Sequence, residues 1–139
     1  MSEEQAQQLL YQMQMLDGYL SELSQNEATI VSVIREASSA IQSLKTIDNK
    51  PDNETLTPVG LGTFIKTKVV PNEKLILNIG AGIAIEKDKD SAINFLELRL
   101  KEMQVALQET SNQKQQISAN LEQGKQQMEQ MLAASRSKK

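Results

Sequence analysis

Two short stretches near the middle of the chain, VGLGTFIK (residues 59–66) and IGAGIAIE (residues 79–86), have almost the same pattern. Each begins with an apolar residue and Gly-x-Gly, continues with an extended apolar run, and ends in a charged residue. Gly-x-Gly after a strand is part of the dinucleotide-binding fingerprint, so the repeat could encode a phosphate loop. The residues after each pair of glycines distinguish this interpretation from a structural one.

The fingerprint requires a third glycine where a helix begins, and in this chain those two positions are Ile65 and Ile85. The residues after each Gly-x-Gly favour another strand over the helix N-terminus that would bind a phosphate. No Gly-Lys-Ser/Thr sequence is present. The glycines fit a sharp bend or a close strand crossing, so we expect two strand–bend–strand units in tandem and no cofactor.

The segment 48–90 contains all three prolines and four of the six glycines, and β-branched and aliphatic residues dominate it. It predicts strands at 55–59, 63–70, 75–79 and 83–87, with a turn at PNEK (residues 71–74). Four short strands bury little apolar surface and leave unpaired edges, so they require partner chains. The residues expected in that assembly are Gly60, Gly62, Phe64, Ile65, Leu75, Leu77, Ile79, Gly80, Gly82, Ile83 and Ile85.

Residues 5–47 and 91–132 contain no proline and one glycine each, and both carry a 4-3 repeat that is mostly apolar. The first series is Leu9, Met13, Leu16, Leu20, Leu23, Glu27, Ile30, Ile34, Ala37, Ile41 and Leu44. The second is Ile93, Leu96, Leu100, Met103, Leu107, Thr110, Lys114, Ile117, Leu121, Gly124, Met128 and Met131. A strict seven-residue repeat indicates a coiled coil, whereas an amphipathic helix on a globular core would have a wider apolar stripe.

The ends of these two helices also have sequence signals. Asp88 or Asp90 could serve as the N-cap of the second helix, and Asn49 and Pro51 end the first. Each helix would be ~60 Å long, and the matched lengths favour an antiparallel hairpin. Residues 133–139 are expected to form a solvated, disordered tail that includes the basic SRSKK.

Glu27 and Lys114 are charged residues within the mostly apolar seam. Antiparallel pairing brings Glu27 within about one helical turn of Thr110 and Lys114. Opposite charges that meet in a seam cost stability but fix the register of the helices. A parallel self-dimer would place Glu27 against its own copy, so the antiparallel hairpin is preferred.

Composition excludes several classes of function. The chain has no Cys and no His, so it can form neither a thiolate zinc site nor a Ser-His-Asp triad, and we expect no enzyme. A net charge of −3 does not suggest nucleic-acid binding. No apolar run approaches the length of a membrane span, and the acidic start lacks the features of a signal peptide. These features predict a cytoplasmic protein.

A coiled-coil hairpin with an inserted β segment resembles the prefoldin family of chaperones. The stretch TPVGLGTFIKTKVVPNEKLILNIGAGIAIEKDKDSAINFL (residues 57–96) is similar to the signature of the alpha class, which has two inserted hairpins where the beta class has one. One departure is Asn78, where that class often has proline. The short chain and the absence of Cys favour an archaeal member over a eukaryotic one.

The resemblance implies a mainly α fold with a small β segment: a long antiparallel coiled-coil hairpin with two inserted β-hairpins that join an oligomeric double β-barrel. It also implies a hexamer of two alpha with four beta subunits. Such a complex captures unfolded or nascent polypeptides without ATP and delivers them to a group II chaperonin.

Both apolar series continue to the free end of the hairpin, here called the tip. The residues predicted to contact clients there are Leu9, Leu10, Met13, Met128, Met131 and Leu132. Tyr11 and Met15 lie off the seam. Met side chains suit surfaces that bind many partners, and Gly124 is expected to loosen the coil nearby.

Two alternatives stay open. The seam residues at the tip could simply pack against each other, as Met does in many coiled coils. The whole chain could also be a coiled-coil scaffold or tether that uses its β segment only to form oligomers.

Overall fold

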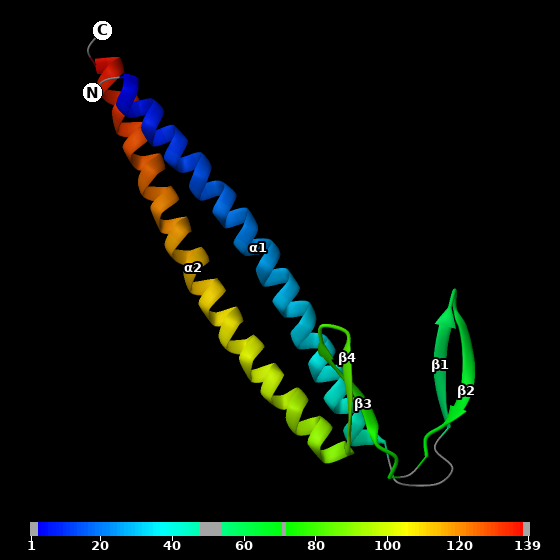
Figure 1. Ribbon diagram of the computed structural model, residues 1–139. Helices are drawn as coiled ribbons and strands as arrows, with labels where there is room; N and C mark the ends of the chain where they lie inside the picture. Colours follow the sequence, from blue (N-terminus) through cyan, green and yellow to red (C-terminus); the bar gives the residue numbers. More distant parts are fainter. Residues whose placement is uncertain (1–2, 48–53, 71, 138–139) are drawn as a thin grey trace. The chain divides into compact units, whose positions relative to one another are not determined.

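The computed structural model describes residues 3–47, 54–70 and 72–137. Its elements are, in order, α1 (Glu3–Thr46), β1 (Glu54–Gly60), β2 (Thr63–Lys68), β3 (Leu75–Gly80), β4 (Ile83–Lys87) and α2 (Lys89–Ser137) (Figure 1). Two long antiparallel helices therefore enclose two β-hairpins in the sequence, which confirms the predicted class of fold.

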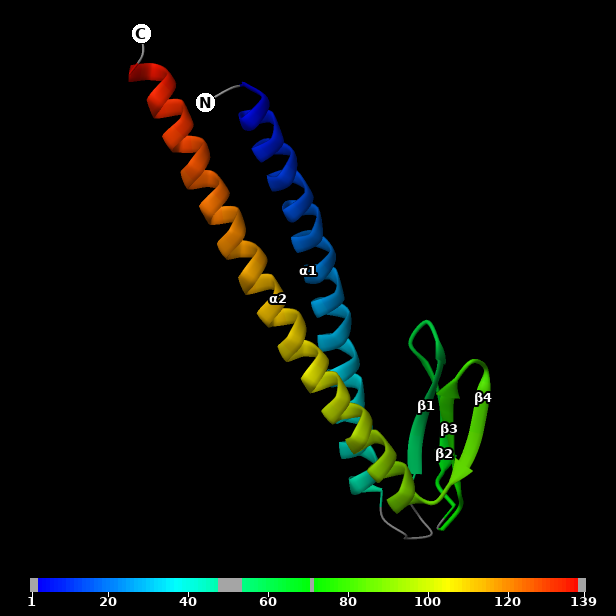
Figure 2. The same ribbon diagram turned by 60° about the vertical axis from the view of Figure 1, so that its left-hand side comes forward.

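The chain divides into two compact units. The coil unit joins Met1–Val33 to Met103–Lys139, and the hairpin unit is Ile34–Glu102. Within the coil unit, α1 and α2 lie side by side and run in opposite directions (Figures 1 and 2). The hairpin unit contains the end of α1, both β-hairpins and the start of α2.

The two 4-3 series form the contact between the helices within each unit. Every position of both series is buried or half-buried, whereas the outward helix faces are mostly exposed. Among the described residues, the apolar side chains classed as buried are Ala37, Ile41 and Ala92, all in the hairpin unit. The core is thus one seam wide, as expected for a coiled coil and not for a helix on a globular body.

Local hydrogen bonds show why α1 ends and α2 begins where they do. The Thr46 hydroxyl donates to the Ser43 carbonyl (2.9 Å) in the last turn of α1. Asn49 and Pro51, the predicted stop signals, lie outside the described residues. Of the two candidate caps of α2, Asp88 is the one that acts: its carboxylate accepts the backbone N–H of Ser91 at 2.8 Å.

The end of α2 differs from the prediction. The helix continues to Ser137, so the expected tail is corrected for residues 133–137. Ala133 and Ala134 are strong helix formers, and the Ser137 hydroxyl donates to the Ala134 carbonyl at 3.0 Å. The apolar repeat stops near residue 132, but helix propensity continues the helix beyond it.

Each Gly-x-Gly forms the loop of one β-hairpin. Leu61 and Gly62 have φ of 47° and 73°, and the corresponding Ala81 and Gly82 have 54° and 74°. Two loop residues with positive φ define a type I′ turn, whose twist matches that of the flanking strands. The predicted strand–bend–strand units are therefore two β-hairpins, β1–β2 and β3–β4.

The physical reason for the glycines differs from the one expected. A Cβ atom at Gly60, Gly62, Gly80 or Gly82 would meet nothing within 4 Å, so no close strand crossing requires them. What requires them is the positive φ at all four positions. A register shift precedes each loop, between Pro58 and Gly60 and between Asn78 and Gly80.

Asn78 has a role at the second of these irregularities. Its side-chain carbonyl accepts the backbone N–H of Gly80 at 3.0 Å. This local bond supports the chain where the ladder between β3 and β4 is interrupted. At the position where the resemblance led us to expect proline, Asn78 thus provides a hydrogen bond.

Candidate functional site

Glu27 and Lys114 meet across the seam of the coil unit. Lys114 Nζ lies 3.2 Å from Glu27 Oε1, and the two side chains are 31% and 27% exposed for Glu27 and Lys114 respectively. The side chains therefore approach as the antiparallel register predicted. Because both are only partly hydrated, each would lose part of its solvation without gaining a counter-charge if the other were removed.

The predicted client residues divide into two groups. Leu9, Met13, Met128 and Met131 are half-buried in the seam, whereas Leu10 and Leu132 are 49% and 53% exposed. Both helices are continuous through this region, since α1 begins at Glu3 and α2 ends at Ser137. Among the predicted client residues, the exposed ones are therefore Leu10 and Leu132, which lie just beside the seam.

Gly124 does not loosen the coil, which corrects the expectation from the sequence. It is buried, and a Cβ atom there would lie 3.0 Å from Met13 Cγ and 3.1 Å from Met13 Sδ. The thioether packs directly onto the backbone of α2 because glycine leaves the space open. Gly124 and Met13 thus form a close contact between the helices.

The outward face of α1 carries large exposed side chains that the 4-3 repeat of the seam does not predict. Tyr11, Met15 and Tyr19 are 64%, 45% and 52% exposed. The signal that could have identified them is their four-residue spacing, which puts the three side chains along one side of the helix. Large apolar groups placed this way on a solvated face are candidates for contacts with other molecules.

The β1–β2 hairpin has two different faces. Leu56 and Phe64 share one face and are 62% and 55% exposed, with Lys66 directly opposite Leu56. The other face has a row of hydroxyl groups, where Thr67 Oγ1 lies 2.7 Å from Thr55 Oγ1 and 2.9 Å from Thr57 Oγ1. Ile65 is on the hydroxyl face, so the two predicted residues Phe64 and Ile65 point to opposite sides.

The β3–β4 hairpin has one clearly apolar face. Leu77 pairs with Ile85 and Leu75 with Lys87, and these apolar residues are half-buried. Ile79 and Ile83, near the loop, are 45% and 54% exposed. Within the described residues each sheet has only two strands, which are marginal alone and leave edges unpaired.

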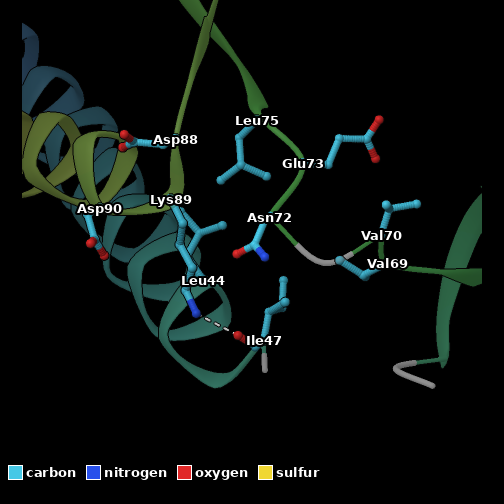
Figure 3. Close-up of a pocket in the computed structure, with 10 residues that line it drawn as sticks. All are labelled: Leu44, Ile47, Val69, Val70, Asn72, Glu73, Leu75, Asp88, Lys89 and Asp90. Atoms are coloured by element: carbon cyan, nitrogen blue, oxygen red, sulfur yellow. Dashed lines mark hydrogen bonds between the residues drawn. The ribbon is translucent and has the colours of Figure 1, made fainter. Parts of the chain in front are cut away.

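A hollow of about 380 Å³ lies in the hairpin unit, where the end of α1, the start of β3 and the start of α2 meet (Figure 3). Lys89 reaches across it, and its Nζ donates to the Ile47 carbonyl at 2.5 Å. A cation at the C-terminus of α1 suits the negative end of the helix dipole.

The hydrogen bonds from Ser91 to the Asp88 carboxylate lower the pKa of Asp88 below its usual 3.8.

The two Gly-x-Gly loops do not have the surroundings of a phosphate loop. Each Gly-x-Gly is followed by a strand, β2 or β4, and not by a helix N-terminus. In the described part of the chain, no three acidic side chains come together in a way that could hold a metal ion. None of the described helices is long and apolar enough to cross a membrane.

Comparison with known proteins gives one consistent result. The model of the prefoldin subunit family matches residues 16–134. The chain is 52% identical to prefoldin subunit alpha of Nitrosopumilus maritimus (strain SCM1) over 134 residues, which are 96% of this chain and 92% of the relative. It is 34% identical to prefoldin subunit alpha of Pyrococcus horikoshii over 110 residues, covering 75% and 72% of the two chains.

Solved structures agree on the fold. The crystal structure of the prefoldin beta subunit from Thermococcus strain KS-1 superposes with a TM-score of 0.64, 17% identity and 92% of each chain covered. The cryo-EM structure of filamentous PFD from Methanocaldococcus jannaschii gives a TM-score of 0.51 at 21% identity, covering 88% of this chain and 96% of the other. At these identities the likeness concerns the arrangement of helices and strands only.

Proposed function

The chain belongs to the prefoldin family, in its alpha class, and from this premise we propose that it captures unfolded or nascent polypeptides at the tip of its coiled coil. The family is one of non-enzymatic chaperones. We further propose that capture needs no ATP and that the complex delivers its clients to a group II chaperonin in the cytoplasm.

The observation that supports client capture is the exposure of apolar side chains beside the seam at the tip. Leu10 and Leu132 come from opposite ends of the chain and are each about half exposed. Leu9, Met13, Met128 and Met131 would add to this surface only where the seam opens. Several weak tips that act on one polypeptide give avidity without a strong contact at any of them.

The proposed partners in assembly are beta-class subunits, four with two alpha chains, whose hairpins would join those of this chain in a double β-barrel. The exposed faces of both hairpins support this proposal. Phe64, Ile79 and Ile83 would be removed from water by neighbouring strands, at roughly 25 cal/mol per Å² of apolar surface. Gly60, Gly62, Gly80 and Gly82 would act in the assembly by fixing the loops.

The test compares a tip variant with a matched control in complexes assembled with a beta-class subunit. Leu10→Ser with Leu132→Ser replaces the two exposed leucines of the tip, and should severalfold reduce protection of an aggregating client, followed by light scattering. Leu98→Ser replaces a residue that is 62% exposed in the hairpin unit, and should leave protection unchanged. Equal protection by the complexes of the tip variant, the control variant and the unchanged chain would contradict the tip proposal.

Truncation of residues 1–12 and 127–139 makes the same point more strongly. Protection should disappear while the complex still assembles, because the β-hairpins are untouched. Loss of assembly would contradict the separation of roles between tip and hairpins. A scaffold or tether, the alternative function, would assemble normally and give no protection even with the complete chain.

Delivery is tested separately by adding a purified group II chaperonin to the client-loaded complex. Transfer of labelled client to the chaperonin fraction is expected without nucleotide. Retention of all client by the complex would contradict this part of the proposal and leave client capture standing.

A further inference from the structure

A second series with 4-3 spacing runs along the side of α1 that faces away from the seam. Its members, here called the outer stripe, are Glu4, Gln8, Tyr11, Met15, Gly18 and Glu22. All six are exposed, and Tyr19 lies beside them, 52% exposed. Because the spacing equals that of the seam, the stripe presents a straight ridge to which another helix could pack.

Gly18 is the unexpected member of the outer stripe. It lies in the interior of α1, where glycine destabilises a helix relative to alanine. Nothing lies within 4 Å of where its Cβ would be, so packing within the chain does not require glycine. The position leaves helix backbone open between Met15 and Glu22, which allows a partner to approach closely.

At one end of the outer stripe, a shallow hollow of about 370 Å³ is lined by Glu4 and Tyr11 together with Gln7, Gln8 and Gln12. Beside the other end, a second hollow of about 270 Å³ lies between the two helices and is lined by Tyr19, Glu22, Leu23 and Asn26 of α1 and by Gln113, Gln116 and Ile117 of α2. Each hollow thus includes one aromatic residue and one carboxylate. A carboxylate beside an aromatic face suits the end of a Lys or Arg side chain.

The charge of this region points to the same class of partner. Residues 3–33 contain five carboxylates and no Lys or Arg. Glu27 is paired with Lys114, whereas Glu4 and Glu22 form no ion pair within the part of the chain that the structure describes. Glu4 and Glu22 are the two of these carboxylates that belong to the outer stripe, so cations are attracted to its two ends.

We propose that the outer stripe docks a basic amphipathic helix of another protein. Apolar side chains of that helix would cover Tyr11, Met15 and Gly18, and a Lys or Arg at each end would enter the two hollows. Tyr11 and Tyr19 are eight positions apart, which is ~12 Å along the helix, and Glu4 and Glu22 are ~27 Å apart. The partner thus needs cationic groups that are about two to five turns apart, with an apolar stretch between them.

The probe is a synthetic helical peptide of about 22 residues, long enough to span the outer stripe. It carries a Leu and Ala stripe with Lys at both ends. We expect it to bind the full-length chain in a fluorescence anisotropy assay, with affinity that falls as salt rises. A peptide with Glu in place of Lys should bind at least about ten times more weakly. Equal binding of the two peptides would overturn the proposal.

Two variants remove the two kinds of contact. Glu4→Gln with Glu22→Gln should weaken binding of the Lys peptide about fivefold and reduce its salt dependence. Tyr11→Ser with Tyr19→Ser should weaken it about tenfold. The matched control is Val105→Ser, which alters an exposed apolar residue of α2 in the same unit, and should change nothing. A loss in the control as large as in the Tyr variant would rule out a specific stripe.

Gly18→Leu separates docking from folding. Leucine is a better helix former and has open space there, so circular dichroism should report a more stable helix. The added side chain should nevertheless weaken peptide binding because it keeps the partner away from the backbone of α1. Unchanged or tighter binding would contradict the helix-on-helix contact. These variants leave Leu10 and Leu132 intact, so their outcome is independent of client capture at the tip.

Discussion

At the scale of single residues, Gly124 and the ion pair of Glu27 and Lys114 have opposite effects on the seam. Gly124 lets Met13 pack against the backbone of α2, and so brings the helices together. Glu27 and Lys114 place an ion pair where apolar residues would be more stabilising. We propose that the ion pair favours one register, since a shift of one heptad would leave both charges without a partner.

Reversal of the charges tests this role. Lys114→Glu should destabilise the chain by about 1–2 kcal/mol, because two half-buried carboxylates would face each other. Adding Glu27→Lys should restore most of the loss, since the pair is then only inverted. Thermal unfolding followed by circular dichroism measures all three variants. Additive effects, with no coupling between the two sites, would show that the pair does not fix the register.

At the scale of elements, both ends of the helix–hairpin junction are tied by side chains. Asp88 caps α2, and Lys89, the next residue, donates to the carbonyl of Ile47 after the end of α1. Two adjacent residues therefore satisfy one backbone group in the first turn of α2 and one directly after the end of α1. The start of α2 is thereby coupled to the end of α1 within the hairpin unit.

The cap gives the stability of α2 a dependence on pH. The pKa of Asp88 is lowered in the folded chain, chiefly by the backbone N–H of Ser91, so the carboxylate stabilises the fold above its unfolded pKa of about 3.8. This contribution is lost as the pH falls below 3.8 through the lower folded pKa. Asp88→Ala should therefore lower the melting temperature at pH 7 and have less effect at pH 2.

Asp88→Asn is the matched control for this prediction. Asparagine is an equally good N-cap but does not titrate, so it should keep most of the stability at pH 7 and show a flatter pH profile. A difference between Asp88→Ala and the original chain that stays constant from pH 7 to pH 2 would contradict the assigned ionisation.

The sequence predicted these elements well where a periodic pattern or a turn signal was available. The half-buried series of both helices follow from the 4-3 repeat, and both hairpins follow from Gly-x-Gly flanked by β-branched residues. The prediction was wrong at residues 133–137, where helix propensity continues α2 beyond the apolar repeat. It was also wrong at Gly124, because its contact with Met13 depends on the other helix. The exposed row of Tyr11, Met15 and Tyr19 does not follow from the 4-3 repeat of the seam, because these residues lie outside it.

At the scale of the whole molecule, the chain has too little buried surface to be expected to act alone. Its buried apolar residues, within the described ranges, are Ala37, Ile41 and Ala92, while large side chains on both hairpins face water. Isolated two-stranded hairpins are marginally stable in water. Much of the stability of the β segment must therefore come from association with other subunits.

The mass of the species in solution measures this association. With a beta-class subunit the chain should form a discrete hexamer by light scattering after size exclusion, and Phe64→Asp with Ile83→Asp should prevent it by placing charges in the new apolar contacts. Leu98→Ser, an exposed position on α2, is the control and should assemble normally. A discrete hexamer from the double Asp variant would show that these faces are not the assembly surface.

The two hairpin loops share one backbone conformation but differ in a single side chain, Leu61 in the first and Ala81 in the second. Leu61 adopts a left-handed conformation that is unfavourable for leucine, and its side chain is entirely in solvent. Glycine or asparagine would fit that turn with less strain. A neighbour that receives the first loop must offer room for an isobutyl group, which the second loop does not need. The tandem repeat is therefore symmetric in backbone shape and asymmetric in side-chain chemistry, so that the two hairpins are not interchangeable in an assembly.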